Sequence, residues 1–286
     1  RWALTGTPIQ NYIGDLQTIL TFVGETDFGW GAPMTIKDAE EMIPKYMLRR
    51  TKEQVKIELP KPKYKTVGLS FETKTEEEFY EKVCEDTLHK HYTVADNHLE
   101  RLLRLRQSTV IPFSFAQKFE QKYGAKMDKF KTMSSTKLNY IVKKLSTTDN
   151  KSVVFCHFKM EIRYLAEKLA TRRIKYGIIS GDIPMDQRKE IITNESYHVL
   201  LIQINAGGTG LNLQHYKEIF ISSPHWNPSI EEQAIGRLYR IGQDDTVIVN
   251  RIIMIRKNQK STIDQRIKDV QDSKTELINS LINETH

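Results

Sequence analysis

The fold of this chain is decided by two stretches that lie close together in the sequence. The first reads Val199-Leu-Leu-Ile-Gln-Ile-Asn-Ala-Gly-Gly-Thr-Gly-Leu-Asn-Leu213, and the second reads His225-Trp-Asn-Pro-Ser-Ile-Glu-Glu-Gln-Ala-Ile-Gly-Arg-Leu-Tyr-Arg-Ile-Gly-Gln243. Residues 199–204 form a short apolar run before a glycine cluster, which is typical of a buried parallel strand followed by a tight turn. Gly207, Gly208 and Gly210 can adopt positive φ and let a backbone, a phosphate or a base come close.

The second stretch predicts a helix. Its start is expected near Asn227-Pro228, because proline suits a first helical position, or at Ser229, which forms a capping-box pattern with Glu232. Both starts place the rest of the stretch on one helix that leads toward Gln243.

On that helix, Gln233, Arg237 and Arg240 lie at i, i+4 and i+7, so their side chains are expected to share one face. Guanidinium groups offer forked donors that match phosphate oxygens, and beside a γ-phosphate they stabilise the charge that develops in phosphoryl transfer. A basic helical face alone is usually solvated surface, and a glycine turn alone is usually just a turn. Together, and followed by Arg240-Ile-Gly-Gln243, they indicate a nucleotide-facing arrangement.

Composition limits the class of protein. The chain has 286 residues, a formal net charge of +7 and 28 % charged residues, which fits a soluble protein that meets a polyanion without proving nucleic-acid binding. Cys84 and Cys156 match no metal spacing and indicate a reducing compartment. No apolar run reaches membrane-spanning length and no secretory signal opens the chain. Because Arg1 falls at the edge of a strand-like segment, we expect the chain to be excised from something longer.

Apolar runs and helical stripes alternate along most of the chain, which predicts a parallel, three-layer α/β sheet. Residues 112–133 are polar and lysine-rich, and they are interpreted as a mobile linker or an insertion without an assigned function. Strands are expected at 65–71, 151–156, 176–179, 199–204, 218–221 and 246–255, and helices at 16–23, 76–89, 99–106, 136–145, 158–169, 186–193 and 261–282.

Three groups of residues together carry a family resemblance. They are Gly207-Gly208-x-Gly210-x-Asn212-Leu213, Trp226-Asn227-Pro228 and Gln233-x-x-x-Arg237-x-x-Arg240-Ile-Gly-Gln243. They resemble the last conserved motifs of Swi/Snf-type DNA-dependent ATPases of helicase superfamily two. The resemblance covers almost the whole chain but only the back half of that family's motor. It implies two RecA-like lobes, with ATP in the cleft between them and duplex DNA across the top.

The resemblance also implies a domain organisation. Residues 1–60 would be the last strand and helices of lobe one with the connector, and 61–135 a helical insertion or linker region. Residues 136–258 would be the RecA-like lobe two, and 259–286 a C-terminal helix that braces the lobes. The basic residues Arg49, Arg50 and Lys52 lie in the segment that leads out of lobe one. A solvated turn and a role in DNA or interlobe contact remain equally open for them.

Site residues follow from the same resemblance, position by position. Arg237 and Arg240 would be the catalytic finger residues, and no metal ligand is assigned. The other expected residues are Gln233, Gly210 and Asn212 for ATP; Thr5, Gly6 and Thr7, in Leu4-Thr-Gly-Thr-Pro-Ile-Gln-Asn11, for lobe coupling; and His157, Arg188, Asn205, Gly207, Gly208 and Trp226 for DNA. From composition alone, the hydroxyls around Gly6 would favour a simple turn. His157 has no nucleophile or carboxylate partner at readable spacing, so a hydrolase dyad is rejected.

The chain departs from the family pattern at a few positions. Asn205 stands where Lys or Arg is common, so a phosphate contact there would be weaker. Ser223 stands where an Asp usually precedes the Trp-Asn-Pro triplet. Gly236 and Tyr239 replace the commoner Asp and His, and Ser180 likewise occupies a usual Asp position. None of these changes removes a finger arginine.

The 286 residues contain neither a phosphate-cradling Gly-Lys-Ser/Thr loop nor an acidic Mg²⁺-binding motif, and both are needed for ATP hydrolysis in this class. We therefore expect ATP and Mg²⁺ to require lobe one of the same motor, and this chain alone to be inactive. The implied function is the C-terminal half of a DNA-stimulated ATPase that translocates on duplex DNA, acting on nucleosomes or other DNA-bound proteins. The implied location is the nucleus or a viral DNA-replication compartment, with no membrane partner.

Two alternatives remain. One is a non-catalytic RecA-like module that docks DNA or protein. The other is an RNA helicase of the same superfamily, against which Trp226-Asn-Pro and Arg240-Ile-Gly-Gln243 argue.

Overall fold

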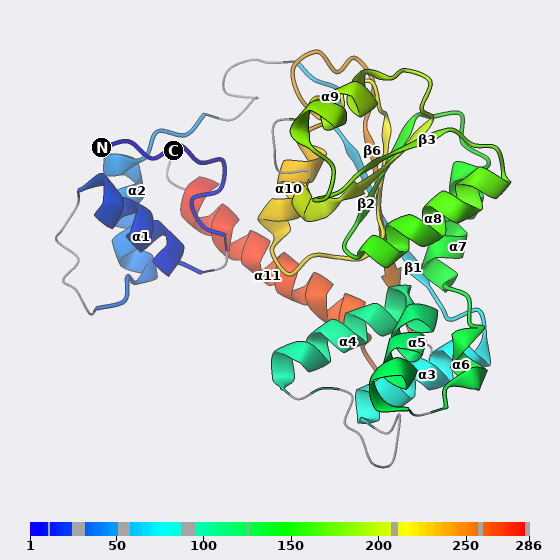
Figure 1. Ribbon diagram of the computed structural model, residues 1–286. Helices are drawn as coiled ribbons and strands as arrows, with labels where there is room; N and C mark the ends of the chain where they lie inside the picture. Colours follow the sequence, from blue (N-terminus) through cyan, green and yellow to red (C-terminus); the bar gives the residue numbers. More distant parts are fainter. Residues whose placement is uncertain are drawn as a thin grey trace. The chain divides into compact units, whose positions relative to one another are not determined.

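The structure is a computed structural model (Figure 1) that describes residues 1–10, 12–24, 32–50, 58–86, 95, 97–124, 126–206, 211–256 and 260–283. The chain forms two compact units. The first contains residues 1–58, 225–232 and 268–286, and the second contains residues 59–224 and 233–267. Each unit has its own hydrophobic core.

The second unit is built on a six-stranded sheet. Its strands are β1 (Lys63–Leu69), β2 (Ser152–Cys156), β3 (Tyr176–Ile179), β4 (Val199–Gln203), β5 (Glu218–Ile221) and β6 (Ile248–Met254), in the spatial order β1-β6-β5-β2-β4-β3. Every neighbouring pair is parallel. The predicted parallel α/β fold is therefore confirmed, and the strands expected at 176–179 and 218–221 have the observed bounds.

Helices cover the sheet because its central strands are apolar on both faces. All five residues of β2 are buried, which requires cover on either side. Helices α7 (Thr136–Leu145) and α8 (Lys159–Thr171) pack against one face, and α9 (Met185–Thr193) contacts β3. As predicted, α7 buries a helical stripe, which consists of Leu138, Ile141, Val142 and Leu145.

A helical layer follows β1 in the chain and contains α3 (Lys74–Glu85), α4 (His98–Val110), α5 (Pro112–Tyr123) and α6 (Asp128–Lys131). The interpretation of 112–133 as a mobile linker is wrong, because this stretch carries two of these helices. Phe115 and Phe130 lie against Phe79, with ring centroids 5.5 Å and 5.1 Å from it. Aromatic side chains that are widely spaced in the sequence, among lysines, thus pack into one core, which the polar composition of the stretch did not indicate.

The predicted domain boundary at residue 136 divides the sheet, because it leaves strand β1 outside lobe two. Strand β1 lies within the stretch 61–135 and pairs with β6 along its whole length, from Lys63 beside Ile248 to Leu69 beside Met254. The sheet of lobe two therefore begins well before its predicted start.

The first unit is a small helical body. Helix α1 (Gly14–Val23), helix α2 (Ile36–Tyr46) and the C-terminal half of α11 (Ile263–Asn283) share a core that includes Leu16, Ile43 and Leu281. The strand expected at the start of the chain does not form, since residues 1–10 contain neither helix nor strand and Leu4 is 97 % exposed. A strand needs a neighbour to satisfy its backbone groups, and no described segment pairs with these residues.

Two further sequence expectations concern the environment of the chain. Among the helices that the structure describes, none is long and apolar enough to cross a membrane. Both cysteines are free thiols; Cys84 is half-buried and Cys156 is buried at the end of β2. Burial raises the pKa of the Cys156 thiol well above its usual range, so that thiol is inert at neutral pH.

The packing predicts a contrast between two leucines of the second unit. Leu201 on β4 is fully buried, whereas Leu99 on α4 is 77 % exposed. Leu201→Ala should lower the free energy of unfolding by about 2–5 kcal/mol through lost burial and a cavity. Leu99→Ala should change it by less than about 0.5 kcal/mol. Urea unfolding followed by circular dichroism measures both, and equal losses would contradict this account of the core.

Candidate functional site

The parallel sheet brings the candidate site together at one edge. Since all strands point the same way, the segments that follow β2, β3, β4 and β5 leave from the same side of the sheet, where ligands bind in open α/β folds. These segments begin with His157, Ser180, Ile204 and Ser222. Gly207, Gly208 and Gly210, three of the predicted site residues, lie outside the described residues.

His157 follows the end of β2 and is half-buried. Its Nε2 lies 2.8 Å from the backbone oxygen of Ser223, and a carbonyl can only accept, so this nitrogen carries the proton. Its backbone N–H donates to Glu161 at 3.2 Å. The imidazole therefore joins the end of β2 to the segment after β5, and its predicted contact with DNA stays a prediction.

Arg188 on α9 is engaged with three backbone carbonyls. Its Nε donates to Ile183 at 2.7 Å, its Nη2 to Ser180 at 3.1 Å and its Nη1 to Ala206 at 3.3 Å. One planar guanidinium thus ties the segment after β3 to the short 3-10 turn (Ile204–Ala206) after β4. This places Arg188 as an anchor of the residue directly before the glycine cluster.

Two predicted polar residues flank that glycine cluster and face solvent. Asn205 is exposed within the 3-10 turn, and Asn212 is exposed between the buried Leu211 and Leu213. The Oδ1 of Asn212 accepts a hydrogen bond from the Gln214 N–H at 3.4 Å. Both side chains are therefore accessible, and their predicted contacts with DNA and ATP stay predictions.

The helix predicted to carry Gln233, Arg237 and Arg240 is shorter than expected. Helix α10 spans Pro228–Ile235, so both arginines lie beyond it and the prediction of one shared helical face is wrong. Beyond Ile235 the backbone changes to tighter turns, in which the Arg237 N–H donates to the Ala234 carbonyl at 3.2 Å and the Leu238 N–H to the Ile235 carbonyl at 3.0 Å. The Arg237 carbonyl then accepts from the Leu213 N–H at 3.1 Å. Gly236, a poor helix former, stands at the point where the helix stops.

Gln243 holds the turn that follows α10. Its buried side-chain amide donates to the backbone oxygens of Gln214 at 2.7 Å, Tyr216 at 3.3 Å and Leu238 at 3.4 Å. The preceding Gly242 has φ +94°, which a residue with a side chain rarely adopts. Gly242 and Gln243 belong to the motif Arg240-Ile-Gly-Gln243, but their sequence alone indicated no role for them.

The exposure of the predicted nucleotide-facing side chains differs. Arg237 is half-buried, while Gln233 and Arg240 are exposed. In the described part of the chain, the Arg240 side chain has no hydrogen-bond or ion-pair partner, so its guanidinium is available to an anion. A turn fixed by Gln243 therefore presents a free cation at its surface.

Residues 225–232 belong to the first unit and begin α10. The Asn227 Oδ1 accepts from the Ser229 N–H at 2.9 Å, which caps a helix that starts at Pro228 rather than at Ser229. Lys274 on α11 donates to the backbone oxygen of Trp226 at 3.1 Å, and Gln271 donates to that of His225 at 2.6 Å. Trp226, predicted to face DNA, is half-buried in this framework.

The Thr5-Gly6-Thr7 motif forms a local turn in the first unit. The Thr7 N–H donates to the Thr5 Oγ1 at 3.1 Å, and both Thr5 and Gly6 are exposed. The role in lobe coupling that the resemblance implies stays a prediction.

A buried ion pair lies beneath this edge of the sheet, and no prediction from the sequence included it. Lys137 and Asp264 form an ion pair of 2.5 Å with both side chains fully buried. Glu161 is also fully buried. Burial lowers the pKa of the Lys137 ammonium and raises the pKa of the Glu161 carboxyl. No sequence signal identified Lys137, because it sits one residue before the apolar stripe of an ordinary amphipathic helix.

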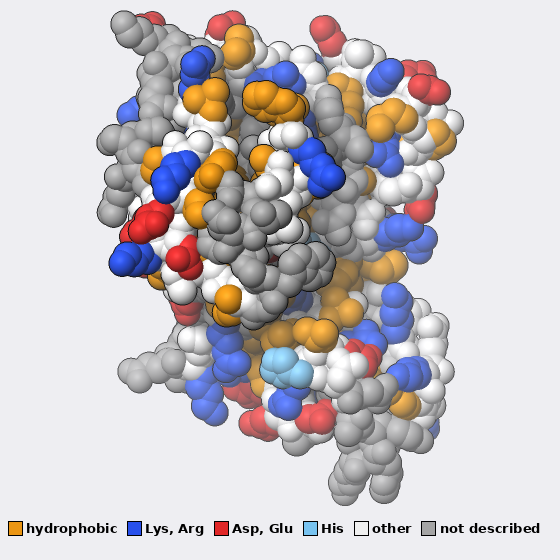
Figure 2. All heavy atoms as spheres, turned by 90° about the vertical axis from the view of Figure 1, so that its left-hand side faces the viewer, with side chains coloured by type: hydrophobic (Ala, Val, Ile, Leu, Met, Phe, Trp, Pro, Cys, Tyr) orange, Lys and Arg blue, Asp and Glu red, His pale blue; other side chains and the backbone are white. Residues whose placement is uncertain are grey.

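Charge and metal ligands add limits. Figure 2 shows lysine and arginine side chains spread over the face it draws, among exposed hydrophobic side chains, rather than gathered in one patch. Within the described ranges, no group of three or more His, Cys, Asp or Glu side chains could hold a metal ion.

Comparison with known proteins defines the class. The sequence matches two family models, the SNF2-related domain over residues 1–114 and the helicase conserved C-terminal domain over residues 135–242. A solved structure, that of the C-terminal part of the Fun30 ATPase domain, is similar with a TM-score of 0.57 and 16 % identity; the match covers 79 % of this chain and 98 % of that one. That likeness confirms the RecA-like fold.

Several relatives match nearly the whole chain, and two examples follow. It is 25 % identical over 316 residues to the probable global transactivator of Orgyia pseudotsugata multicapsid polyhedrosis virus, covering 100 % of this chain and 61 % of that protein. It is 24 % identical over 301 residues to the CHD3-type chromatin-remodeling factor CHR7 of Arabidopsis thaliana, covering 99 % and 24 %. The chain thus spans less than two thirds of these relatives. It belongs to the SNF2-related family of helicase-type ATPases, as its motifs predicted.

The anchoring role of Arg188 can be tested directly. Arg188→Lys replaces a planar fork by a single ammonium that cannot bridge all three carbonyls, so stability should fall by about 1–3 kcal/mol. Amide exchange at Gly181 and Ile183 should accelerate, as measured by hydrogen exchange with mass spectrometry. Arg163→Lys, at an exposed position on α8, is the matched control and should leave both unchanged. Unaltered exchange in Arg188→Lys would rule out the anchor.

Proposed function

We propose that this chain is the C-terminal part of a DNA-stimulated ATPase that moves along duplex DNA and remodels chromatin or displaces other DNA-bound proteins. The observation that carries the proposal is the turn after α10. In a chain of the SNF2-related family, Gln243 fixes that turn against the backbone just before β5, and the turn presents Arg240 to solvent. A fixed guanidinium costs little reorganisation when charge develops on a phosphate.

The residues of this chain account for only part of an ATP-binding site. Arg240 and Arg237 would contact the phosphates, and the exposed Gln233 amide would contact a phosphate oxygen. Gly210, outside the described residues, and Asn212 would complete the nucleotide contacts. Mg²⁺ prefers carboxylate, phosphate and water oxygens, and the described residues offer no cluster of such ligands. The metal, which neutralises phosphate charge when bound, would therefore be held by lobe one of the same motor.

Duplex DNA is the proposed polymer, read through its backbone and not its bases. Asn205 and Trp226 would contact it, together with the glycines of the cluster and the segment at His157. Arg188 supports this contact by holding the Ala206 carbonyl rather than by reaching a phosphate itself. The similarity to a chromatin-remodeling factor and to a viral transactivator supports action on nucleosomes or other DNA-bound proteins, in a nucleus or a viral replication compartment.

The test compares ATP hydrolysis by the full-length protein with and without duplex DNA. Duplex DNA should stimulate hydrolysis, and Arg240→Ala should reduce kcat by about 10³-fold or more, because a finger arginine stabilises transition-state charge. Arg163→Ala removes an exposed arginine of the same unit and should hydrolyse ATP at the normal rate. No stimulation by duplex DNA would leave a docking module, and stimulation by RNA alone would indicate an RNA helicase. A fully active Arg240→Ala protein would overturn the finger assignment.

A further inference from the structure

Four charged side chains of the second unit, all with almost no exposure, lie around the ends of β5 and β6. Arg106 is 8 % exposed, and Lys137, Glu161 and Asp264 are fully buried. Two are cationic and two are anionic, so the cluster is neutral as a whole. Charges persist in a protein interior only when they are paired and hydrogen-bonded, which makes the partners of these four informative.

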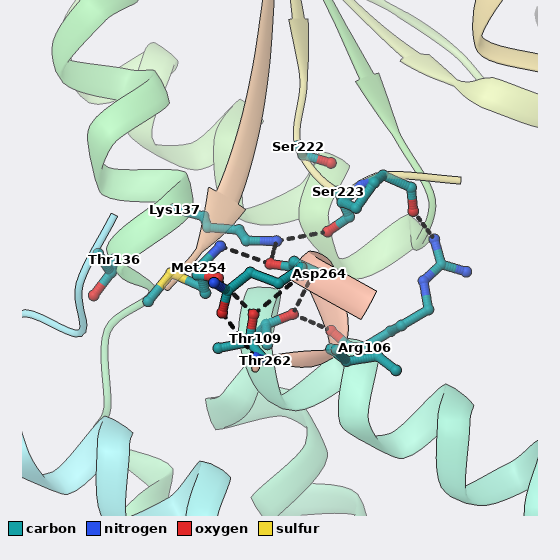
Figure 3. Close-up of polar contacts among 12 residues, drawn as sticks. Arg106, Thr109, Thr136, Lys137, Ser222, Ser223, Met254, Thr262 and Asp264 are labelled. Carbon is teal, nitrogen blue, oxygen red and sulfur yellow. Dashed lines mark hydrogen bonds and ion pairs between the residues drawn. The ribbon is translucent and has the colours of Figure 1, made fainter. Parts of the chain in front are cut away.

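Three of them hold three consecutive residues of one segment. The Ser222 hydroxyl donates to the Glu161 carboxylate, the Lys137 Nζ donates to the Ser223 Oγ at 3.2 Å, and the Arg106 Nη2 donates to the Pro224 carbonyl at 3.1 Å. Figure 3 shows Lys137 and Arg106 approaching this segment from different helices. Residues 222–224 connect the end of β5 to the segment that starts α10.

The fourth charge fixes a second segment. Besides the ion pair with Lys137, the Asp264 carboxylate accepts from the Met254 N–H at 2.8 Å and from the Thr109 Oγ1 at 3.4 Å (Figure 3). Asp264 lies in the first turn of α11. One ammonium therefore joins the segment after β5 to the beginning of the last helix.

Both segments leave the second unit directly beyond these contacts. The chain passes into the first unit between Pro224 and His225, and again between Ile267 and Lys268. The Lys137 contacts are thus made just before each of these two passages. Close packing of apolar residues would stabilise such a core equally well, whereas an ion pair with directed hydrogen bonds also specifies one geometry.

We propose that Lys137 and Asp264 are positioning residues that set residues 222–224 against the start of α11, and thereby set the turn that carries Arg237 and Arg240. The effect on catalysis rests on the proposed function, while the effect on the position of residues 222–224 does not. Neither residue touches the nucleotide.

The test is the double variant K137M/D264N of the full-length protein, which removes both charges of the pair together, so that neither partner is left as an unpaired ion. It should unfold cooperatively, and the amides of β4 should keep their protection. Exchange at the Ser222 amide, which donates to the Phe155 carbonyl, should accelerate by about 10-fold or more. The kcat for DNA-stimulated ATP hydrolysis should fall by about 10- to 100-fold with little change in KM for ATP, because the finger arginines are misplaced and not removed.

Two further variants separate positioning from general stability. Asn250→Ala removes a buried polar side chain that donates to Glu218 at 2.9 Å near the opposite edge of the sheet, and it should leave Ser222 exchange and kcat unchanged. Ser223→Ala removes only the contact between Lys137 and the segment, and it should change exchange and kcat in the same direction as the double variant if the latter fails to fold.

The outcomes distinguish the two proposals. A folded double variant with normal Ser222 exchange and normal kcat would overturn the positioning role. If the wild-type protein shows no DNA-stimulated hydrolysis, the proposed function fails, and the exchange at Ser222 still decides whether the ion pair holds the segment.

Discussion

Parallel strand pairing is the constraint on which the rest of this structure depends. Because all six strands point the same way, every connection leaves the sheet at one edge as irregular backbone with carbonyl groups that no ladder satisfies. Long polar side chains supply the missing donors. Arg188 donates to three carbonyls at this edge and Arg106 donates to one more, while Gln243 donates to three in the backbone before β5 and in its own turn. A few side-chain amides and guanidinium groups therefore hold these loops in place.

The polar residues of the candidate site are of two kinds. Arg188, Gln243 and His157 bind backbone carbonyls and keep the loops in place, whereas Arg240 and Asn205 point to solvent. A site that binds a polyanion needs both, since an exposed cation is selective only if its backbone is held still. A family motif includes residues of both kinds, and only their contacts in the structure distinguish them.

Periodicity predicted the sheet well because the pattern of a buried strand is local. The strands at 176–179 and 218–221 were found at their predicted bounds, and α7 has its predicted stripe. The failures depend on partners distant in sequence that are present or absent. Leu213 takes the Arg237 carbonyl in the turn after α10, and Phe79 gives the aromatic residues of 112–133 a core to join. The candidate site was thus predictable as a set of positions, but its geometry was not. No spacing rule reports which carbonyl a distant amide will reach.

The buried ion pair also explains a departure from the family pattern. Ser223 stands where the family usually has an aspartate. In the structure, the Ser223 hydroxyl accepts from Lys137, whose charge is already matched by Asp264. An aspartate at 223 would add a second buried carboxylate beside one ammonium and leave the cluster with a net negative charge, which a protein interior tolerates poorly. A neutral serine keeps the hydrogen bond and the charge balance together. A serine at 223 therefore fits the charge balance that Lys137 and Asp264 already have.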